Sequence, residues 1–453
     1  MRVTVALLLL ALSAPLLAQD PAAIDKAVTE ALAKSGAPSA SIAVVKDGRL
    51  LYAKAYGNAR VQPPLAATPD MRYSIGSISK QFTAASVLLL AEEGKLTLDD
   101  KVVRWLPELT RAQDVTIRQL LSMTSGYQDF WPQDYVMPMM LKPVTPAEIL
   151  NGWAKKPLDF EPGAKWQYSN TNYVIAGLIV ERVAGMPLLD FLRKRVFGPL
   201  KMTSVTDTDQ APLGEGDPSR YMRHALAAPR PAPKEGAGWM FAAGELAMTA
   251  RDLAAWDISM IDQTVLKPSS YRDMQTEVLL RNGAGTHYGL GVYVTIVDGR
   301  RLISHGGEVS GFTARNEVYP DERAAIVVLT NMDATDASTQ IASKIAPLLF
   351  TVTDTAALEQ TKRIFASLQQ GKIDRSLFTS NANAYFSANA LADFASSLGP
   401  LGAPQELTQT AQSLRGGMTL RRYRVKFPQK TLRLTTFTMP DGKLEQYTVA
   451  ATE

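Results

Sequence analysis

The spacing of apolar residues divides the first half of the chain into a helix, a strand pair and a long helical region. Pro21–Lys34 carries apolar side chains at helical spacing, which predicts an amphipathic helix. The β-rich runs Ser41–Val45 and Leu50–Tyr56 flank an Asp-Gly dipeptide, which favours a hairpin turn. From about residue 77 to about residue 256 the periodicity is mostly helical.

Strand-forming patterns return in the second half of the chain. Four alternating segments are separated by turn residues and followed by one helix: Tyr288–Ile296, Arg301–His305, Phe312–Tyr319, Ala324–Thr330 and then Ser338–Phe350. With the early strand pair they can complete one antiparallel sheet, the terminal helices covering one face and the helical insertion the other. We therefore predict an α+β domain over residues 19–352.

The pattern changes after a junction at Thr351–Thr355. Helical spacing continues to Gly371, a second helix follows Ser387 as its N-cap, and alternating strands lead to a late Asp-Gly turn. We predict a separate small α+β module over residues 355–453, in which no catalytic constellation is recognisable. Its basic run Arg421–Lys426 indicates a solvated face, and binding of an acidic cell-wall polymer is the alternative.

The first residues have the three-part pattern of a secretory signal peptide. One arginine precedes the apolar run Val5–Leu12, and a small residue, Ala18, marks a cleavage point. The apolar run is shorter than the roughly 20 residues that a helix needs to span a bilayer. We therefore expect a signal peptide over residues 1–18, no stable membrane anchor, and an exported protein that is periplasmic or secreted.

Composition narrows the chemistry. Hydrophobic residues make up 46% of the chain and charged residues 20%, which is typical of a folded globular protein. The net charge of +4 is too small for nucleic acid to be the expected partner. No cysteine and only three histidines, without HExxH spacing, exclude thiol catalysis, Cys-ligated zinc and a His-rich metal site. We expect no cofactor and no metal in the catalytic centre.

A serine and a lysine three residues apart are the first candidate for chemistry. Ser77 and Lys80 open a predicted helix that ends near Gly94, so they lie on one helix face. A serine becomes a nucleophile when a neighbour takes its proton, and a lysine can do so if burial lowers its pKa. An N-capping serine and a solvated lysine would give the same pattern. No other serine in the chain lies three residues before a lysine.

Two further motifs support a reactive site. Tyr168-Ser169-Asn170 lies at a loop–helix junction, where a phenol can share the proton of a lysine and a carboxamide can hold a substrate amide. His305-Gly306-Gly307 lies at a predicted strand end, where glycines let a substrate approach the strand edge. A Ser-His pair from His305 and Ser310 is the competing interpretation, and it leaves the other motifs unexplained.

Together the three motifs resemble those of the serine β-lactamase and penicillin-binding protein superfamily, on its branch of class C β-lactamases, D,D-carboxypeptidases, D-aminopeptidases and β-lactamase-like esterases. Ser77–Lys80 is similar to the SxxK box, Tyr168–Asn170 to the Tyr-x-Asn box, and His305–Gly307 to the Lys-Thr-Gly box in a His-x-Gly form. The resemblance covers roughly residues 21–350 and implies a β-lactamase/transpeptidase-like fold. The C-terminal module faintly resembles the nuclear-transport-factor-like fold.

The resemblance implies that Ser77 attacks an amide or ester carbonyl and forms an acyl-enzyme, with Lys80 and Tyr168 as proton acceptor and donor. The expected protein is a serine hydrolase acting on a D-Ala-type peptide, a short ester or a β-lactam. Its partner would be a small-molecule or peptide substrate, including ones derived from the cell wall. The alternative is a penicillin-binding-like sensor or scaffold with little or no turnover.

The resemblance also implies the substrate-binding groups. Asn170 would position the acyl-side amide, His305 and Gly307 would line the cleft, and the backbone N–H groups of Ser77 and Glu308 would form the oxyanion hole. The central glycine of the third box lacks the threonine hydroxyl that helps to bind a substrate carboxylate, and the lysine is replaced by a histidine that is largely neutral at pH 7. Both departures favour an esterase or an aminopeptidase.

Two loops are predicted to rim the cleft and to shape the substrate pocket. Tyr127–Pro143 is rich in aromatic residues and methionine, and Thr206–Gly238 is rich in proline, glycine and aspartate. Ordinary surface loops are the alternative interpretation. Met123, which stands where relatives often have a histidine before Thr-Ser-Gly, has no catalytic interpretation from the sequence.

Overall fold

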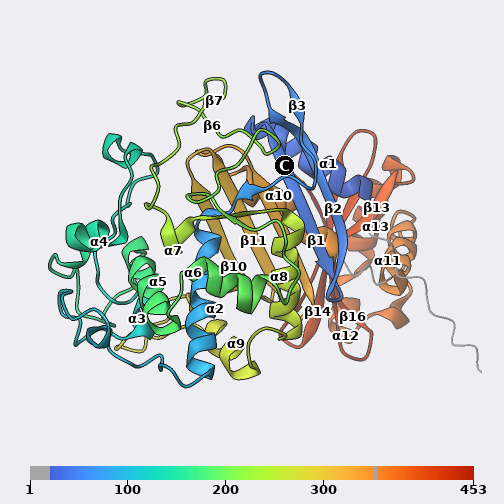
Figure 1. The fold of residues 1–453 in the computed structure, drawn as a ribbon. Helices are drawn as coiled ribbons and strands as arrows, with labels where there is room; N and C mark the ends of the chain where they lie inside the picture. Colours follow the sequence, from blue (N-terminus) through green and yellow to red (C-terminus); the bar gives the residue numbers. More distant parts are fainter. Residues whose placement is uncertain (1–20, 351–354, 453) are drawn as a thin grey trace, which may run out of the picture.

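A seven-stranded antiparallel sheet forms the centre of the first of two folded regions (Figure 1). The computed structural model describes residues 21–350 and 355–452. The strand order is β3-β2-β1-β12-β11-β10-β9. The strands are β1 (Ser39–Lys46), β2 (Arg49–Arg60), β3 (Leu65–Ala66), β9 (Tyr293–Val297), β10 (Arg300–Val309), β11 (Phe312–Tyr319) and β12 (Ala324–Thr330). The early strand pair and the late strands thus share one sheet, as the sequence predicts.

Two helical layers cover this sheet. On one face the terminal helices α1 (Pro21–Ser35) and α10 (Ala337–Phe350) pack against each other and against the sheet. Successive side chains of a strand point to opposite faces of the sheet, so alternate residues of β1 belong to two different cores. Ile42 belongs to the core under α1 and α10, whereas Ala43 belongs to the larger core on the other face. The α+β architecture predicted from the sequence is therefore confirmed.

The helical insertion supplies the larger core. Its helices are α2 (Ser79–Glu92), α3 (Ile117–Leu121), α4 (Pro146–Ile149), α5 (Asn170–Ala184), α6 (Leu188–Leu192), α7 (Phe241–Gly244), α8 (Ala250–Asp262) and α9 (Pro268–Met274). Short strands also occur there, namely β4 (Tyr73–Ser74), β5 (Thr206–Asp207), β6 (Tyr221–Met222), β7 (Arg230–Pro231) and β8 (Leu246–Met248). A 3₁₀ turn, η1 (Gly76–Ile78), leads directly into α2, and α2 is buried along nearly its whole length. Ser77 is therefore followed directly by a helix that is anchored in the core, while Ser77 itself stays partly exposed.

Two of the strand boundaries that differ from the sequence prediction concern the cleft. β10 runs to Val309 instead of ending at His305, so His305-Gly306-Gly307 lies inside the strand. β9 begins at Tyr293 instead of Tyr288, because Gly291 adopts a positive φ of 78° that breaks the extended backbone. β9 therefore pairs with β10 only as far as Ser304. On the edge of Gly306-Gly307 that faces away from β11, none of the described strands forms a pair.

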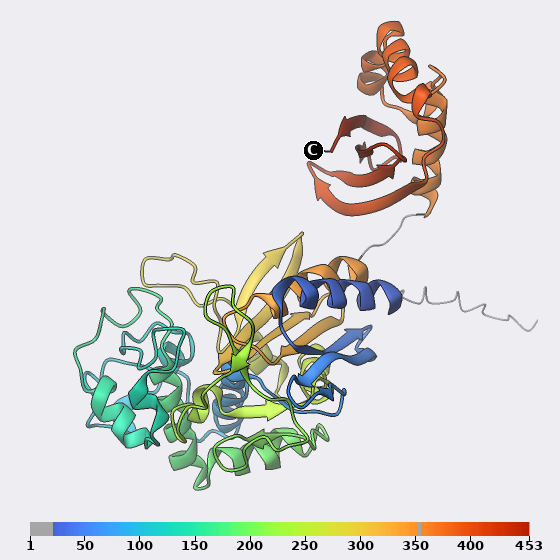
Figure 2. The same ribbon diagram turned by 90° about the horizontal axis from the view of Figure 1, so that it is seen from above.

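The C-terminal region has a core of its own (Figure 2). Its helices are α11 (Thr355–Leu368), α12 (Ser380–Tyr385) and α13 (Ala388–Leu398), and its four-stranded sheet contains β13 (Glu406–Arg415), β14 (Met418–Lys426), β15 (Thr431–Thr438) and β16 (Leu444–Ala451) in that order. Ser387 caps α13 as predicted, since its side chain accepts a hydrogen bond from the amide of Ala390. The sequence analysis did not identify β13.

Part of the sequence prediction concerns residues outside the described ranges. The signal peptide over residues 1–18 lies outside them, as does most of the junction at Thr351–Thr355. Among the residues that the structure does describe, none of the helices combines the length and the hydropathy needed to cross a bilayer.

The separate cores predict separate unfolding. Leu434 is fully buried in the core of the C-terminal module, so Leu434→Ala should destabilise that module by about 2–5 kcal/mol. Differential scanning calorimetry should show one transition moving to lower temperature while the other stays in place. Leu414→Ala, at a leucine that is 81% exposed on β13, is the matched control and should move neither. A single transition that shifts as a whole would contradict independent folding.

Candidate functional site

Lys80 is the centre of the candidate site. Its side chain is fully buried, and its Nζ donates to Ser77 Oγ at 3.0 Å, to Asn170 Oδ1 at 2.8 Å and to the carbonyl oxygen of Ala243 at 2.8 Å. A protonated amine can donate to all three oxygens. A neutral amine keeps two donors, for Asn170 and Ala243, and directs its lone pair at Ser77 Oγ. The geometry therefore allows Lys80 to take the proton of Ser77.

Burial makes this proton transfer feasible near neutral pH. Removal of Lys80 from water lowers its pKa to about 7, and the negative charge of Asp129 opposes this shift. A substantial fraction of Lys80 is then neutral at pH 7. The sequence prediction that burial tunes this lysine agrees with the structure.

Asn170 approaches the same pair from the start of α5, and Tyr168 approaches it from the loop just before that helix. The ring centroid of Tyr168 lies 5.0 Å from the Lys80 Nζ. Burial raises the pKa of Tyr168 well above its ordinary value, while a hydrogen bond with Ser77 opposes the shift. Tyr168 therefore keeps its proton at neutral pH and can donate it, whereas Lys80 can accept one. Asn170 is the first residue of α5, and its Oδ1 is already bonded to Lys80.

Asp129 orients Asn170, although no sequence motif marks it as a site residue. Its carboxylate accepts hydrogen bonds from the backbone amide of Asn170 at 2.9 Å and from Asn170 Nδ2 at 3.2 and 3.3 Å. Since the side-chain nitrogen of Asn170 is held by Asp129, the carbonyl oxygen of the Asn170 side chain faces Lys80. Asp129 lies in the aromatic loop Tyr127–Pro143, and only its position close to the Gly126 turn could have pointed to it.

Met123 packs against the segment that contains Tyr168 and Asn170. It is fully buried, and its sulfur lies 3.4 Å from the amide nitrogen of Ser169 and 3.7 Å from the Nδ2 of Asn172. Its carbonyl oxygen accepts a hydrogen bond from the amide of Gln167 at 3.0 Å. Met123 has φ of 62°, in the left-handed region, so its backbone is held in an uncommon conformation. Met123 therefore helps to position the backbone segment that carries Tyr168.

Two glycines let β10 lie directly against the 3₁₀ turn that carries Ser77. A Cβ on Gly307 would lie 1.9 Å from the carbonyl oxygen of Ile75, and a Cβ on Gly76 would lie 2.7 Å from the amide nitrogen of Glu308. Any side chain would push the two backbones apart. The amide groups of Ser77 and Glu308, which the resemblance assigns to an oxyanion hole, are thus brought together by backbone packing.

His305 is buried beside the site and is neutral. Its Nε2 is hydrogen bonded to Tyr288 OH at 3.0 Å, and its Nδ1 lies 2.5 Å from the carbonyl oxygen of Gly306. Burial and the nearby charge of Lys80 lower the pKa of His305 to about 3. The Oγ of Ser310 donates to the carbonyl oxygen of Pro233 instead of to His305. The competing Ser-His interpretation therefore has no hydrogen bond to support it.

These groups open into one cleft of about 820 Å³. The aromatic loop contributes Trp131 to Val136 to its lining, so the prediction that Tyr127–Pro143 rims the cleft is confirmed, and its effect on substrate choice stays a prediction. No residue of Thr206–Gly238 lines the cleft, so the prediction for that loop is wrong. Its proline- and aspartate-rich composition serves contacts within the loop and behind the site, such as the bonds of Asp217 with Arg72.

The charged residues that line the cleft are mostly acidic. They are Asp129, Asp134, Glu308 and Asp333, against the single cation Arg315. Arg315 is partly neutralised, because its Nε donates to Glu317 Oε1 at 2.9 Å. Burial and the neighbouring Asp134 and Asp333 raise the pKa of Glu308. The cleft therefore favours a substrate that carries a positive charge over one that carries a free carboxylate.

Comparison with known families and curated proteins agrees with this arrangement. A family model described as Beta-lactamase matches residues 24–347. The chain is 28% identical over 307 residues to Penicillin-binding protein 4* of Bacillus subtilis, covering 65% of this chain and 68% of that protein. It is 29% identical over 305 residues to a D-aminopeptidase of Brucella anthropi, covering 65% of this chain and 56% of that protein. The chain thus spans little more than half of the second relative.

Solved structures show the same fold. A D-stereospecific amidohydrolase from a Streptomyces species has 29% sequence identity and a TM-score of 0.63, covering 74% of this chain and 99% of that one. An octameric penicillin-binding protein homologue from Pyrococcus abyssi has 22% identity and a TM-score of 0.66, covering 96% of both chains. The second likeness concerns the fold alone, and it extends into the C-terminal module.

The lowered pKa of Lys80 predicts a pH profile for the reaction of Ser77. Acylation by excess fluorescent penicillin or by a p-nitrophenyl ester should accelerate as pH rises through about 7, because neutral Lys80 is the proton acceptor. Asp129→Asn removes the charge that holds the Lys80 pKa up, so the midpoint should move to lower pH. The rate should be measured from about pH 5 to about pH 9 for both proteins.

Asp134→Asn is the matched control for this shift. Asp134 lies in the same loop and lines the same cleft, but its charge acts on Glu308 and not on Lys80. It should leave the midpoint unchanged. A wild-type midpoint near the ordinary lysine value of about 10, or equal midpoints in the wild type and Asp129→Asn, would contradict the assignment of Lys80.

Proposed function

The chain belongs to the beta-lactamase family, and we propose that residues 21–350 act as a serine hydrolase that cleaves an amide or ester carbonyl through an acyl-enzyme on Ser77. One observation carries the proposal. A fully buried lysine with a pKa of about 7 places its Nζ 3.0 Å from the Oγ of the serine. A serine so placed can lose its proton at neutral pH.

Each step uses a group already in place. Neutral Lys80 accepts the proton of Ser77 as Oγ attacks the carbonyl carbon, and the backbone amides of Ser77 and Glu308 donate to the oxygen that becomes negative. The leaving amine or alcohol needs a proton, and Tyr168 holds one beside Lys80. Lys80 then reprotonates Tyr168. In the second half of the reaction, a water molecule attacks the acyl-enzyme. The protons then move through the same groups in the reverse direction, and Ser77 is released.

The cleft supports a substrate that carries a free amine near the scissile bond. The third box offers a neutral His305 and a bare Gly306 in place of groups that bind a carboxylate, and the charged residues that line the cleft are mostly acidic. The relatives named D-aminopeptidase and D-stereospecific amidohydrolase point in the same direction. We assign the substrate class as amides and short peptides with an N-terminal D-amino acid, with simple esters as accessible substitutes.

A slow penicillin-binding scaffold is the second candidate. It is favoured by the altered third box, by the extra C-terminal module and by the relative named Penicillin-binding protein 4*. Such a protein would be labelled on Ser77 by a fluorescent penicillin and would retain the label. Multiple turnover of any amide or ester excludes this candidate.

A substrate panel tests the proposed activity. D-amino-acid amides should be hydrolysed in preference to L-amides and to D-Ala-D-Ala peptides, and nitrocefin should be turned over poorly. Ser77→Ala should lower kcat/KM by about 10³-fold or more. Ser310→Ala is the matched control and should leave the activity nearly unchanged. Loss of activity in Ser310→Ala together with retained activity in Ser77→Ala would contradict the proposal.

Export is the second prediction of this proposal. It rests on the signal pattern of residues 1–18. Expression of the full chain in a Gram-negative host should place it in the periplasm with a mature N-terminus at Gln19, as read by mass spectrometry. A chain lacking residues 2–18 should stay in the cytoplasm. Recovery of an intact N-terminus from the cytoplasm with the full chain would count against export.

A further inference from the structure

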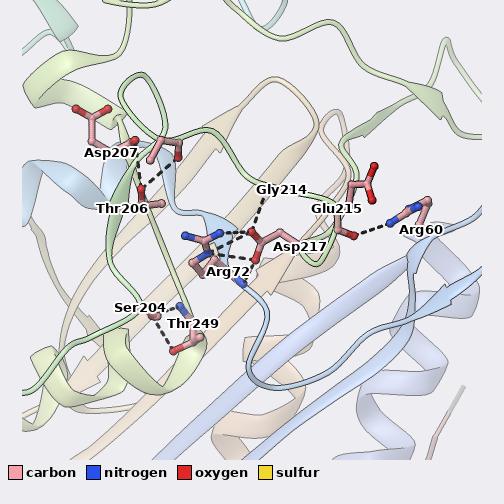
Figure 3. Close-up of polar contacts among 10 residues, drawn as sticks. Arg60, Arg72, Ser204, Thr206, Asp207, Gly214, Glu215, Asp217 and Thr249 are labelled. Atoms are coloured by element: carbon pink, nitrogen blue, oxygen red, sulfur yellow. Dashed lines mark hydrogen bonds and ion pairs between the residues drawn. The ribbon is translucent and has the colours of Figure 1, made fainter.

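Three carboxylates gather behind the turn that carries Ala243. Asp207 ends β5, Asp209 follows two residues later, and Glu245 directly follows α7. One carboxylate oxygen of each residue lies within 4.8 Å of those of the other two. Asp207 is 4% exposed, Glu245 is 5% exposed, and Asp209 is partly buried. Figure 3 shows Asp207 next to Thr206.

The cluster lacks the partners that buried carboxylates need. Asp207 Oδ1 accepts from the backbone amides of Asp209 at 2.7 Å and of Gln210 at 3.4 Å, and Asp209 Oδ2 accepts from the amide of Gly238 at 2.6 Å. The other oxygen of Asp209 is buried without a hydrogen-bond partner. Among the residues that the structure describes, none donates a hydrogen bond to the Glu245 carboxylate.

No basic side chain of the described ranges forms an ion pair with any of the three acids. The charge of Lys234 opposes the burial that raises the pKa of Asp209, but its Nζ donates to the carbonyl oxygen of Thr208 at 2.7 Å and to none of the three carboxylates. Burial, reinforced by the charges of Asp207 and Asp209, raises the pKa of Glu245 well above its usual value. Buried carboxylates that face one another without a cation are unfavourable, and they are commonly found paired or on a metal ion.

We propose that Asp207, Asp209 and Glu245 bind a calcium ion. The three side chains offer oxygen atoms alone, which suits a hard cation and not zinc or copper, which favour nitrogen or sulfur. Calcium bonds oxygen at about 2.3–2.6 Å, so oxygens up to about 5 Å apart can share one ion. Backbone carbonyls and water can complete its shell. The absence of cysteine and the scarcity of histidine argue against metals that need sulfur or nitrogen ligands, but not against a hard cation held by oxygen atoms.

At this position a bound calcium ion would have a structural role. In the sequence, Glu245 lies between Ala243 and Leu246. The carbonyl oxygen of Ala243 accepts a hydrogen bond from Lys80. The amide of Leu246 donates to Ser79 Oγ at 3.2 Å, and its carbonyl oxygen accepts from the amide of Ile75 at 3.0 Å. A calcium ion on Glu245 would therefore tie the Asp207–Asp209 segment to the wall behind the nucleophile. The ion itself takes no part in the chemistry.

Calcium binding is tested directly on the full-length protein. After treatment with EDTA and removal of the chelator, isothermal titration with CaCl₂ should show one site per chain, and MgCl₂ should bind at least about tenfold more weakly. The melting temperature should rise by about 5 °C at a hundredfold excess of calcium over its dissociation constant. Neither readout depends on the hydrolase activity, so the failure of one proposal leaves the other standing.

Two nearly isosteric variants and one control decide the assignment. Asp209→Asn and Glu245→Gln should each lose the calcium-dependent rise in melting temperature, even if removal of a buried charge makes the calcium-free variant more stable than the wild type. Glu215→Gln removes an exposed carboxylate of the same loop, beside Arg60 in Figure 3, and should keep the full rise. Absence of calcium binding by the wild type, or an undiminished rise in both cluster variants, would overturn the proposal.

Discussion

The burial of one amine, that of Lys80, is the constraint on which the rest of the site depends. Its three hydrogen-bond acceptors come from η1, α5 and the turn at α7, so three segments far apart in sequence must converge on one nitrogen. The same burial lowers the pKa of Lys80 and raises that of Tyr168, which separates an acceptor from a donor within one pocket. Packing thus supplies both the geometry and the protonation states.

The sequence predicted the fold class and the reactive residues because both depend on local patterns. Strand alternation identified the halves of the sheet, and the spacing of Ser77 and Lys80 placed them on one helix face. What it missed depends on distant contacts. The hydrogen bond to the carbonyl oxygen of Ala243 cannot be predicted from the residue type, and Asp129 gains its role from a helix 41 residues away. β10 continues through two glycines because β11 pairs with it as far as Val309.

The wrong expectation about Thr206–Gly238 has the same origin. A loop rich in proline, glycine and aspartate resembles a flexible rim, but these aspartates are largely turned inward. Asp217 holds Arg72, and Asp207 and Asp209 face Glu245 behind the catalytic turn. Composition predicts that a segment is a loop, whereas the burial of its charged side chains shows which contacts the segment makes. The C-terminal module shows the opposite case, since its separate core could be anticipated from a change in pattern alone.

The contact of η1 with β10 through Gly76 and Gly307 has a consequence for how this protein can change over evolutionary time. The nucleophile and the two amides beside it are fixed by main-chain atoms, whereas much of the cleft wall comes from side chains of the loop Trp131–Val136. Reactivity and selectivity are therefore encoded in different parts of the chain. Mutations in the loop can accumulate and select new substrates while the reaction itself is inherited intact.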